Sequence, residues 1–336
     1  MFNSLQQIIA GGRDTTTDEL NLPGNEGAAA ELQARLCDLG ILDPIIDGDA
    51  STPFKPVGKG DGKIGLNTRG AIFEFCRLAN IQYVDRLLNI ALLKALVNAR
   101  PEVLTPVQFD ARPGDTPSVV LAKRLLRYMR MQGYWIARSP NMYNIVYVEG
   151  MNEDGHLNDD RFNEWNDRRI VIRIGVAGAP EMVVNDQATT EPGLFYTKNP
   201  LNPQGAARIA FGQYKAWVDG LHQGWQPALV QRENLKVHRD LNQDGKRSAN
   251  DPIDIGKTFG INQHSTSPNK TPDLVGPYSA GCLVGRRYSW HQAFLRTVKK
   301  DVRYIMNKGY LFMSAIIAGD AFVSWVQKDE KMRPPG

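Results

Sequence analysis

The feature that most constrains the fold is a change of apolar pattern along the chain. Between residues 28 and 97 apolar side chains recur at helical spacing, whereas beyond residue 145 most apolar runs are short and alternate with polar residues. The first pattern is typical of amphipathic helices, and the second of strands with one buried face. At 336 residues the chain also exceeds what one hydrophobic core usually serves. We therefore expect an α+β multidomain protein, in which a small all-α three-helix bundle precedes a mainly β domain.

Three apolar stripes supply the expected bundle. Leucines between residues 32 and 39 form the first stripe and Gly40 follows as a C-cap, residues 68–75 form the second, and residues 84–97 form the third. Residues 1–27 are polar and show little periodicity, so we expect a mobile leader with at most one short helix. A bundle of this size is an accessory module rather than a catalytic scaffold.

Proline marks the expected boundary between the two regions. Four prolines between residues 101 and 117 remove backbone donors and favour an extended chain. Beyond them, the patterns predict a helix over residues 118–133 and strands within residues 168–176, 228–240 and 310–319. The predicted division is a leader (1–27), a helical domain (28–100), a linker with a helix (101–144) and a mainly β domain (145–336).

Composition and charge exclude several classes of function. The net charge of +4 is small, and no block of Lys and Arg indicates nucleic-acid binding. Three cysteines are too few for a disulfide scaffold, although a pair between Cys37 and Cys76 stays open. The longest apolar run, residues 310–319, is shorter than the roughly 20 residues of a membrane-spanning helix. Residues 1–20 lack the pattern of a signal peptide, so we expect synthesis in the cytoplasm and no membrane insertion.

The segment from residue 259 to residue 286 carries the clearest chemistry. An apolar strand ends at His264, a polar loop follows, and a tight Ser-Ala-Gly-Cys turn ends at Cys282. Thiolate is the attacking form of cysteine, and an imidazole on an adjacent strand end produces it by accepting the proton. Gly281 permits a sharp turn, and amide groups near Cys282 are placed to hold a developing oxyanion. The alternative is a buried, unreactive cysteine beside an ordinary histidine.

These residues also carry a resemblance to a known family. His264, Ser265, Ser279, Gly281 and Cys282 resemble the signature of the L,D-transpeptidase catalytic domain, with 14 residues between His264 and Ser279. The resemblance implies that Cys282 is the nucleophile and His264 its base, while the hydroxyl of Ser265 helps to orient the imidazole. It also implies that Ser279 and Gly281 belong to the substrate and oxyanion site.

The sequence departs from this signature at two positions. Ala280 stands where the family has a second histidine, and Val284 stands where Asn or Arg is common. Arg286 is a candidate to replace the missing polar group and to bind a substrate carboxylate, with a solvated surface arginine as the alternative. Similarity to a phage-associated branch extends over residues 145–326 and implies a β-sandwich-like catalytic domain with a helix alongside.

The helical region resembles a second family, the three-helix peptidoglycan-binding domain. The match consists of Leu-Gln, Leu-Gly, Asp-Gly, Gly, Thr and an aromatic residue in that order, carried by Leu32, Gln33, Leu39, Gly40, Asp61, Gly62, Gly65, Thr68, Ala71 and Phe75. The insertion at residues 49–60 is longer than usual for that family. An accidental match of two amphipathic helices with a Gly-rich loop is the alternative.

One further loop and the remaining histidines bear on metals. Asp240, Asn242, Asp244, Gly245 and Asp251 have the spacing of the start of a calcium loop, and an Asx-rich hairpin turn explains them as well. No HExxH motif or Cys/His cluster predicts zinc, so no metal ligand is assigned. The other histidines are expected to be ordinary ones, although two of them can still face the groove, namely His222 and His238.

Together these observations predict an enzyme that forms a thioester between Cys282 and peptidoglycan stem peptides, without a cofactor. If water resolves the thioester, the protein is a wall peptidase of the phage endolysin type, released to the wall by another system. If an amine resolves it, the protein is an L,D-transpeptidase. Two other hypotheses stay open: a non-catalytic wall-binding or virion protein, and a cytosolic cysteine acyltransferase unrelated to the wall.

Overall fold

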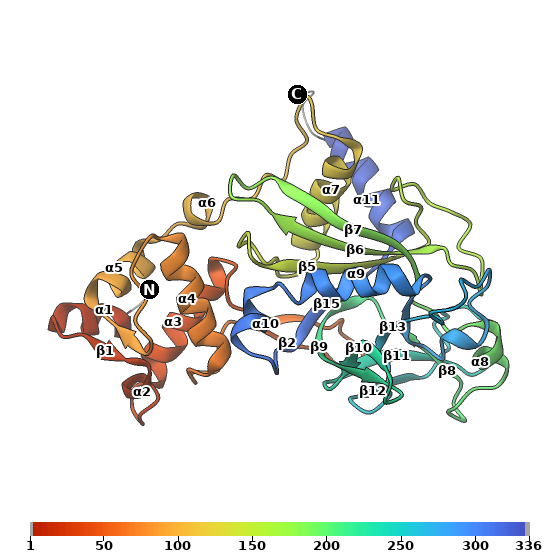
Figure 1. Cartoon of the computed structure of the whole chain (residues 1–336), viewed down its shortest axis with the longest axis horizontal. Helices are drawn as coiled ribbons and strands as arrows, with labels where there is room; N and C mark the ends of the chain where they lie inside the picture. The colour runs from red at the N-terminus through yellow and green to blue at the C-terminus, as the bar shows by residue number, and fades with distance from the viewer. Residues whose placement is uncertain (1–2, 333–336) are drawn as a thin grey trace.

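Helices whose apolar stripes face one another form the N-terminal part of the computed structural model, which describes residues 3–332 (Figure 1). α3 (Glu26–Asp38), α4 (Leu66–Leu78) and α5 (Ile90–Asn98) bury Leu32, Phe75 and Leu93 in one core. The expected helical region is therefore confirmed. α5 begins later than residue 84, because Leu87–Leu88 form β4, which pairs with β1 (Thr15–Thr16), and the Asn89 side chain then caps the helix by accepting from the Leu92 amide.

The segment expected to be a mobile leader is instead part of this core. α1 (Asn3–Gly11) and α2 (Thr17–Leu20) bury Leu5 and Leu20 against α3, α4 and α5. The carboxylate of Glu31 in α3 accepts hydrogen bonds from the amides of Ser4 and Leu5, which ties the first turn of α1 to the bundle. The expectation was wrong because Leu5, Ile8 and Ile9 already form a short stripe at helical spacing.

Short elements connect the helical region to the β region. β2 (Ile45–Asp47) and β3 (Lys55–Gly58) form a hairpin within the loop between α3 and α4. α6 (Pro101–Leu104) follows α5, and α7 (Pro117–Met131) occupies the position of the helix predicted at 118–133. The proline-rich stretch between them is held against the β region, where the Gln108 amide donates to the Gly178 carbonyl.

Eight strands close into a barrel with both parallel and antiparallel neighbours. Their order around the barrel is β10-β13-β14-β7-β6-β5-β15-β9, and only the β13–β14 and β15–β5 pairs are parallel. The bounds are β5 (Tyr143–Glu149), β6 (Asp167–Ile174), β7 (Pro180–Thr189), β9 (Gly212–His222), β10 (Gln226–Gln231), β13 (Gln263–Ser265), β14 (Leu283–Gly285) and β15 (Phe312–Ala318). The runs predicted as strands at 168–176 and 310–319 are β6 and β15, whereas the run at 228–240 is divided between β10 and β11 (Leu235–Asp240), which belong to different sheets.

The closed barrel differs from the β-sandwich-like domain that the family resemblance implied. β9 is long enough to pair with β10 along its C-terminal half and with β15 along its N-terminal half, so the sheet has no free edge at this point. Trp217 and Tyr147 fill the interior. A separate three-stranded sheet lies outside the barrel and consists of β8 (Ala206–Ile209), β11 (Leu235–Asp240) and β12 (Ile253–Gly256).

Helices cover two faces of the barrel. α7 and α11 (Gly319–Met332) pack through Leu125 and Phe322 on the outer side of β5, β6 and β15 (Figure 1). α9 (Tyr288–Val298) lies across β7, β13 and β14, and α10 (Val302–Met306) follows it. Two single turns, α8 (Leu194–Lys198) and η1 (Gly276–Tyr278), lie beside one another at the end of the barrel far from the helical region.

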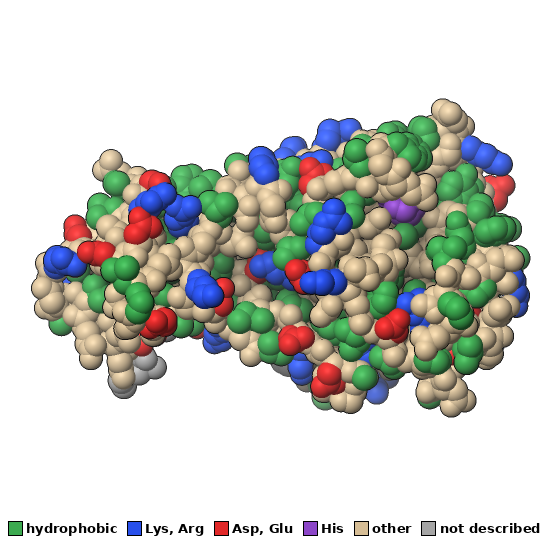
Figure 2. Space-filling view, turned by 90° about the horizontal axis from the view of Figure 1, so that it is seen from below, with side chains coloured by type: hydrophobic (Ala, Val, Ile, Leu, Met, Phe, Trp, Pro, Cys, Tyr) green, Lys and Arg blue, Asp and Glu red, His purple; other side chains and the backbone are tan. Residues whose placement is uncertain are grey.

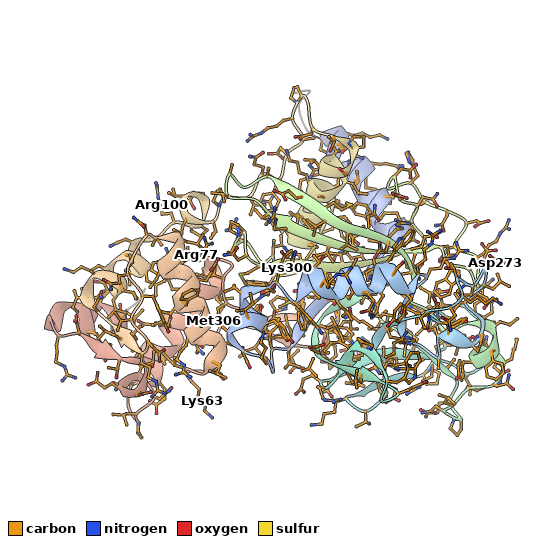
Figure 3. All side chains as sticks on the ribbon, viewed as in Figure 1. Lys63, Arg77, Arg100, Asp273, Lys300 and Met306 are labelled. Carbon is orange, nitrogen blue, oxygen red and sulfur yellow. The ribbon has the colours of Figure 1, made fainter. Side chains whose placement is uncertain are left out.

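Buried polar contacts join the helical region to the barrel. Asp43 forms ion pairs with Arg303 of α10 at 2.6 Å and with Lys215 of β9 at 3.0 Å. Trp135 Nε1 donates to the Cys37 carbonyl, and Met306 packs on α4, as its place in Figure 3 shows. Because the charges of Asp43, Lys215 and Arg303 are shielded from water, each needs its partner in place. The two regions therefore meet at an ordered interface rather than through a free linker.

The surface charges, the helix lengths and the cysteines each test one expectation from the sequence. On the face in Figure 2, Lys and Arg side chains are interspersed with Asp and Glu, and neither sign gathers into one patch. Across residues 3–332, every helix is too short or too polar to span a bilayer. Cys37, Cys76 and Cys282 are all free thiols, so the disulfide left open between the first two is not formed.

Candidate active site

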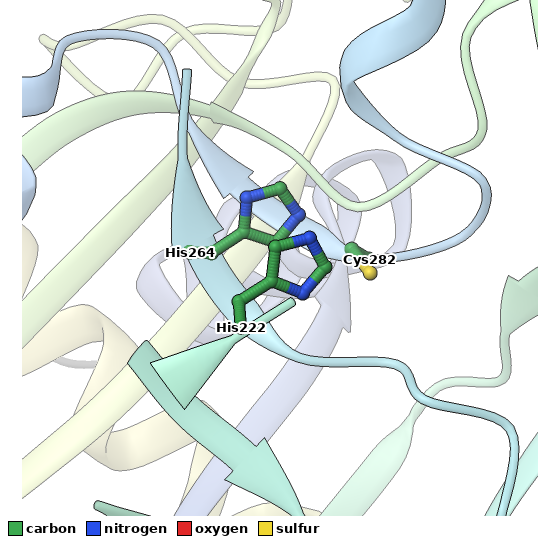
Figure 4. A group of neighbouring side chains, drawn as sticks. All are labelled: His222, His264 and Cys282. Carbon is green, nitrogen blue, oxygen red and sulfur yellow. The ribbon is translucent and has the colours of Figure 1, made fainter. Parts of the chain in front are cut away.

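Neighbouring strand ends bring the predicted nucleophile and base together. β13 and β14 are parallel, His264 lies opposite Val284, and Cys282 directly precedes β14. A third side chain joins them from the end of β9, where His222 stacks on His264 with ring centroids 3.9 Å apart and planes 7° apart (Figure 4). The sequence had left His222 as one of two histidines able to face the groove, without a reason to choose it.

The three side chains lie close together in the wall of one pocket. One ring nitrogen of each histidine and the Cys282 Sγ lie within 4.8 Å of one another. The pocket has a volume of about 460 Å³, and its walls include Tyr196 and Tyr278. An acyl group that enters this pocket would therefore meet the sulfur and both imidazoles.

The hydrogen bond of His264 fixes which of its nitrogens is free. His264 Nδ1 lies 2.8 Å from the Ser265 carbonyl oxygen, which only accepts, so Nδ1 carries the proton and Nε2 has the lone pair of a base. The hydroxyl of Ser265 instead contacts the Gln226 side chain and the Thr266 carbonyl. Ser265 thus orients the imidazole through its backbone, not through the hydroxyl that the resemblance implied.

Burial favours the uncharged forms of the His264 imidazole and the Cys282 thiol. Burial, with the neighbouring His222, lowers the pKa of His264 to about 3, and burial raises the pKa of the Cys282 thiol to about 11. The thiol donates to the Gly260 carbonyl and accepts from the Asn262 amide, each at 3.4 Å. At neutral pH the pair is therefore a thiol and a neutral imidazole.

The turn before Cys282 is shaped by Ser279 and Gly281. The Ser279 hydroxyl donates to the Cys282 carbonyl at 2.9 Å and accepts from the Gly281 amide at 3.1 Å, and Ser279 is fully buried. Gly281 has φ +126°, and a Cβ there would lie 2.4 Å from the Ala207 carbonyl oxygen. Ser279 and Gly281 therefore fix the backbone that positions the Cys282 sulfur, and neither residue lines the pocket.

Arg286 lies away from the pocket. Its guanidinium donates to the Pro272 carbonyl and to the Gln187 side chain, and so it fastens the loop before Cys282 to β7. The cation at the pocket wall is Arg239, paired with Asp254 at 2.8 Å. Sequence reasoning missed this pair because Arg239 comes from β11, which the chain pattern does not connect to the nucleophile.

Two groups of metal-ligating side chains occur within residues 3–332: His222 with His264 and Cys282, and Glu149 with Asp160 and Glu191. An imidazole binds a metal along its ring plane, and two parallel stacked rings direct their lone pairs side by side rather than to a common point, so the first group does not fit an ion as built. In the second group, arginines already pair with Glu149 and Glu191.

The predicted calcium loop uses its oxygens internally. The Asp240 carboxylate accepts from the amides of Asp244 and Gly245, and the Asp244 carboxylate accepts from the Lys246 amide. These are the contacts of the Asx-rich turn that was the alternative explanation.

No protein-family model matches the chain, and no curated protein sequence matches it.

Proposed function

We propose that this protein is a cysteine peptidase of bacterial peptidoglycan, in which Cys282 attacks a carbonyl of a stem peptide and water resolves the thioester. The observation that carries the proposal is the convergence of the Cys282 sulfur with His264, whose Nε2 is left free by the Ser265 carbonyl, in an open pocket. This is the arrangement of a nucleophile, its base and an orienting group.

The reaction follows from these positions. The Cys282 sulfur forms a bond to the carbonyl carbon while the thiol proton passes to His264 Nε2. The C–N bond then breaks and the proton leaves with the amine, which produces a thioester and a free amino group. Water, activated by the same nitrogen, attacks the thioester and restores the thiol. An amine in place of water makes the reaction a transpeptidation.

Support for the wall as substrate comes from the helical region. Of the residues that carry the resemblance to peptidoglycan-binding domains, Gln33, Asp61 and Thr68 are joined in one network through the Gln33 side chain. They line a second cavity, of about 530 Å³, between the helical region and the barrel. A wall polymer bound there would contact both the helical region and the barrel that contains Cys282.

The test is digestion of purified Gram-negative sacculi by the full chain, followed by mass spectrometry of the muropeptides. We expect wild type to shorten stems or to remove cross-links, and Cys282→Ala to do neither. Cys37→Ala, which instead removes a buried free thiol on α3, is the matched control and should retain activity. New cross-links would identify a transpeptidase, and sacculi that wild type leaves unchanged yet binds would favour the non-catalytic wall-binding protein.

A further inference from the structure

Asn262 contacts both Cys282 and His222 in the candidate site. Its backbone amide donates to the Cys282 sulfur, and its carbonyl accepts from the Leu283 amide. Its side chain lies between the Gln231 amide, 2.9 Å from Oδ1, and His222 Nδ1, 2.9 Å from Nδ2. Because Asn262 is buried, these contacts are its fixed environment.

This environment determines the tautomer of His222. The Gln231 amide only donates, so the Asn262 atom facing it is the oxygen and the atom facing His222 is the NH₂ group. That group donates, so His222 Nδ1 accepts and the proton of the neutral ring sits on Nε2. His222 Nε2 has no hydrogen-bond partner in the described part of the chain, and the ring lines the pocket.

The two stacked imidazoles therefore have opposite polarity toward the pocket. His264 has its proton on Nδ1, bound to the Ser265 carbonyl, and a bare Nε2. His222 has a bare Nδ1, bound to Asn262, and a proton on Nε2. In Figure 4 the parallel rings overlap, and both lie beside the Cys282 sulfur. One ring can accept a proton from the thiol while the other offers a hydrogen to a substrate oxygen.

We infer that His222 is a catalytic hydrogen-bond donor, whose Nε2–H binds the carbonyl oxygen that becomes negative during attack by Cys282, and that Asn262 is the positioning residue that fixes this tautomer. The reaction it assists rests on the proposed function, whereas the tautomer does not. His222 keeps its proton throughout: the sulfur–carbon bond forms, the thiol proton goes to His264, and the leaving group departs with that proton. The donor stabilises only the oxyanion.

Two reagents separate this role from simple support of His264. Iodoacetamide alkylates a cysteine by displacing iodide and develops no oxyanion, whereas p-nitrophenyl acetate acylates it through one. His222→Phe keeps a ring to stack on His264 but removes the donor, and His222→Gln restores a neutral donor. We expect His222→Phe to slow acylation of Cys282 by about 10²–10³-fold and to leave alkylation near the wild-type rate, and we expect His222→Gln to recover part of the acylation rate.

Equal losses in both reactions would overturn the inference, since the ring would then act only through His264. A wild-type Cys282 that is alkylated but not acylated would overturn it as well. Conversely, selective loss of acylation in a protein whose wild type leaves sacculi unchanged would refute the proposed function and support the donor.

The role of Asn262 is tested by NMR on selectively ¹⁵N-labelled histidine, assigned by the signal lost in His222→Phe. We expect wild-type His222 to have a bare Nδ1 and a protonated Nε2. Asn262→Asp still accepts from the Gln231 amide but presents an oxygen to His222, so Nδ1 should gain a proton whether the ring is neutral or charged. A bare Nδ1 in this variant would refute the assignment.

Discussion

Replacement of Gly281 by alanine should disable the site with a loss that can be worked out from two distances. The new Cβ would lie 2.4 Å from the Ala207 carbonyl oxygen, whereas ordinary contact begins at 3.4 Å, so the turn must move by about 1.0 Å (3.4 − 2.4) from β8. A misplacement of about 1 Å at a reacting group costs on the order of 10²-fold in rate. The φ of +126° adds about 1–3 kcal/mol of backbone strain for a non-glycine residue.

The matched control is Gly276→Ala, in the same loop. Gly276 also has positive φ, at +50°, but a Cβ there would meet nothing within 4 Å. We expect Gly276→Ala to lose about 1–2 kcal/mol of stability and to keep the acylation rate, whereas Gly281→Ala loses about 2–4 kcal/mol and about 10²-fold in acylation of Cys282 by p-nitrophenyl acetate. Chemical denaturation measures the first quantity and released nitrophenolate the second. A Gly281→Ala protein with wild-type values for both would show that the turn does not press on β8.

Two further predictions concern buried charge. Burial and the neighbouring His222 lower the pKa of His264 from 6.5 to about 3, so the native state binds fewer protons than the unfolded chain between these two pH values. The stability of the native state therefore falls as the pH drops below 6.5. His264→Gln should therefore be less sensitive to acid than wild type, by about 3 kcal/mol between pH 7 and pH 4 in urea unfolding, and identical pH profiles would contradict this. Arg247→Met should cost about 3–5 kcal/mol at pH 8, since Glu149, which Arg247 binds at 2.7 Å, would stay buried without this ion pair. The cost should shrink toward pH 5, because burial and Glu149 raise the pKa of the adjacent Asp167 to about 7, so that Asp167 is protonated there and no longer adds negative charge beside Glu149. The control is Arg13→Met at an exposed ion pair, which should cost less than about 1 kcal/mol.

Local pattern was sufficient for most individual elements. The apolar stripes of α3 and α4 and the short apolar run of β6 depend on residues within the segment, although β6 is buried on both faces rather than on one. Pattern failed at residues 3–11, where the stripe of Leu5, Ile8 and Ile9 was too short to be recognised as a helix, and where Glu31 holds the first turn against the bundle. It also failed at residues 84–89, where pairing of β4 with β1 took residues from the expected helix. In both cases a partner distant in sequence decided the outcome.

The candidate site was likewise predicted only in part from the local sequence. His264 and Cys282 were predicted because both belong to one segment of the chain, and the roles of Ser265 and Arg286 changed because side-chain chemistry alone does not say which atom faces which neighbour. His222 lies at the end of β9, a strand that comes earlier in the chain. It reaches His264 because β9 pairs with β10 and β10 pairs with β13.

The sequence by itself thus determined most types of element, the cysteine and histidine proposed to react, and the absence of any block of like charge. Only the tertiary structure decided that the sheet closes into a barrel, that His222 joins the reacting pair, and which nitrogen of each ring carries a proton. The physical reason is that these properties depend on strand pairing and on hydrogen bonds between residues far apart in the chain. Neither strand pairing nor such hydrogen bonds produce a periodic pattern in the local sequence.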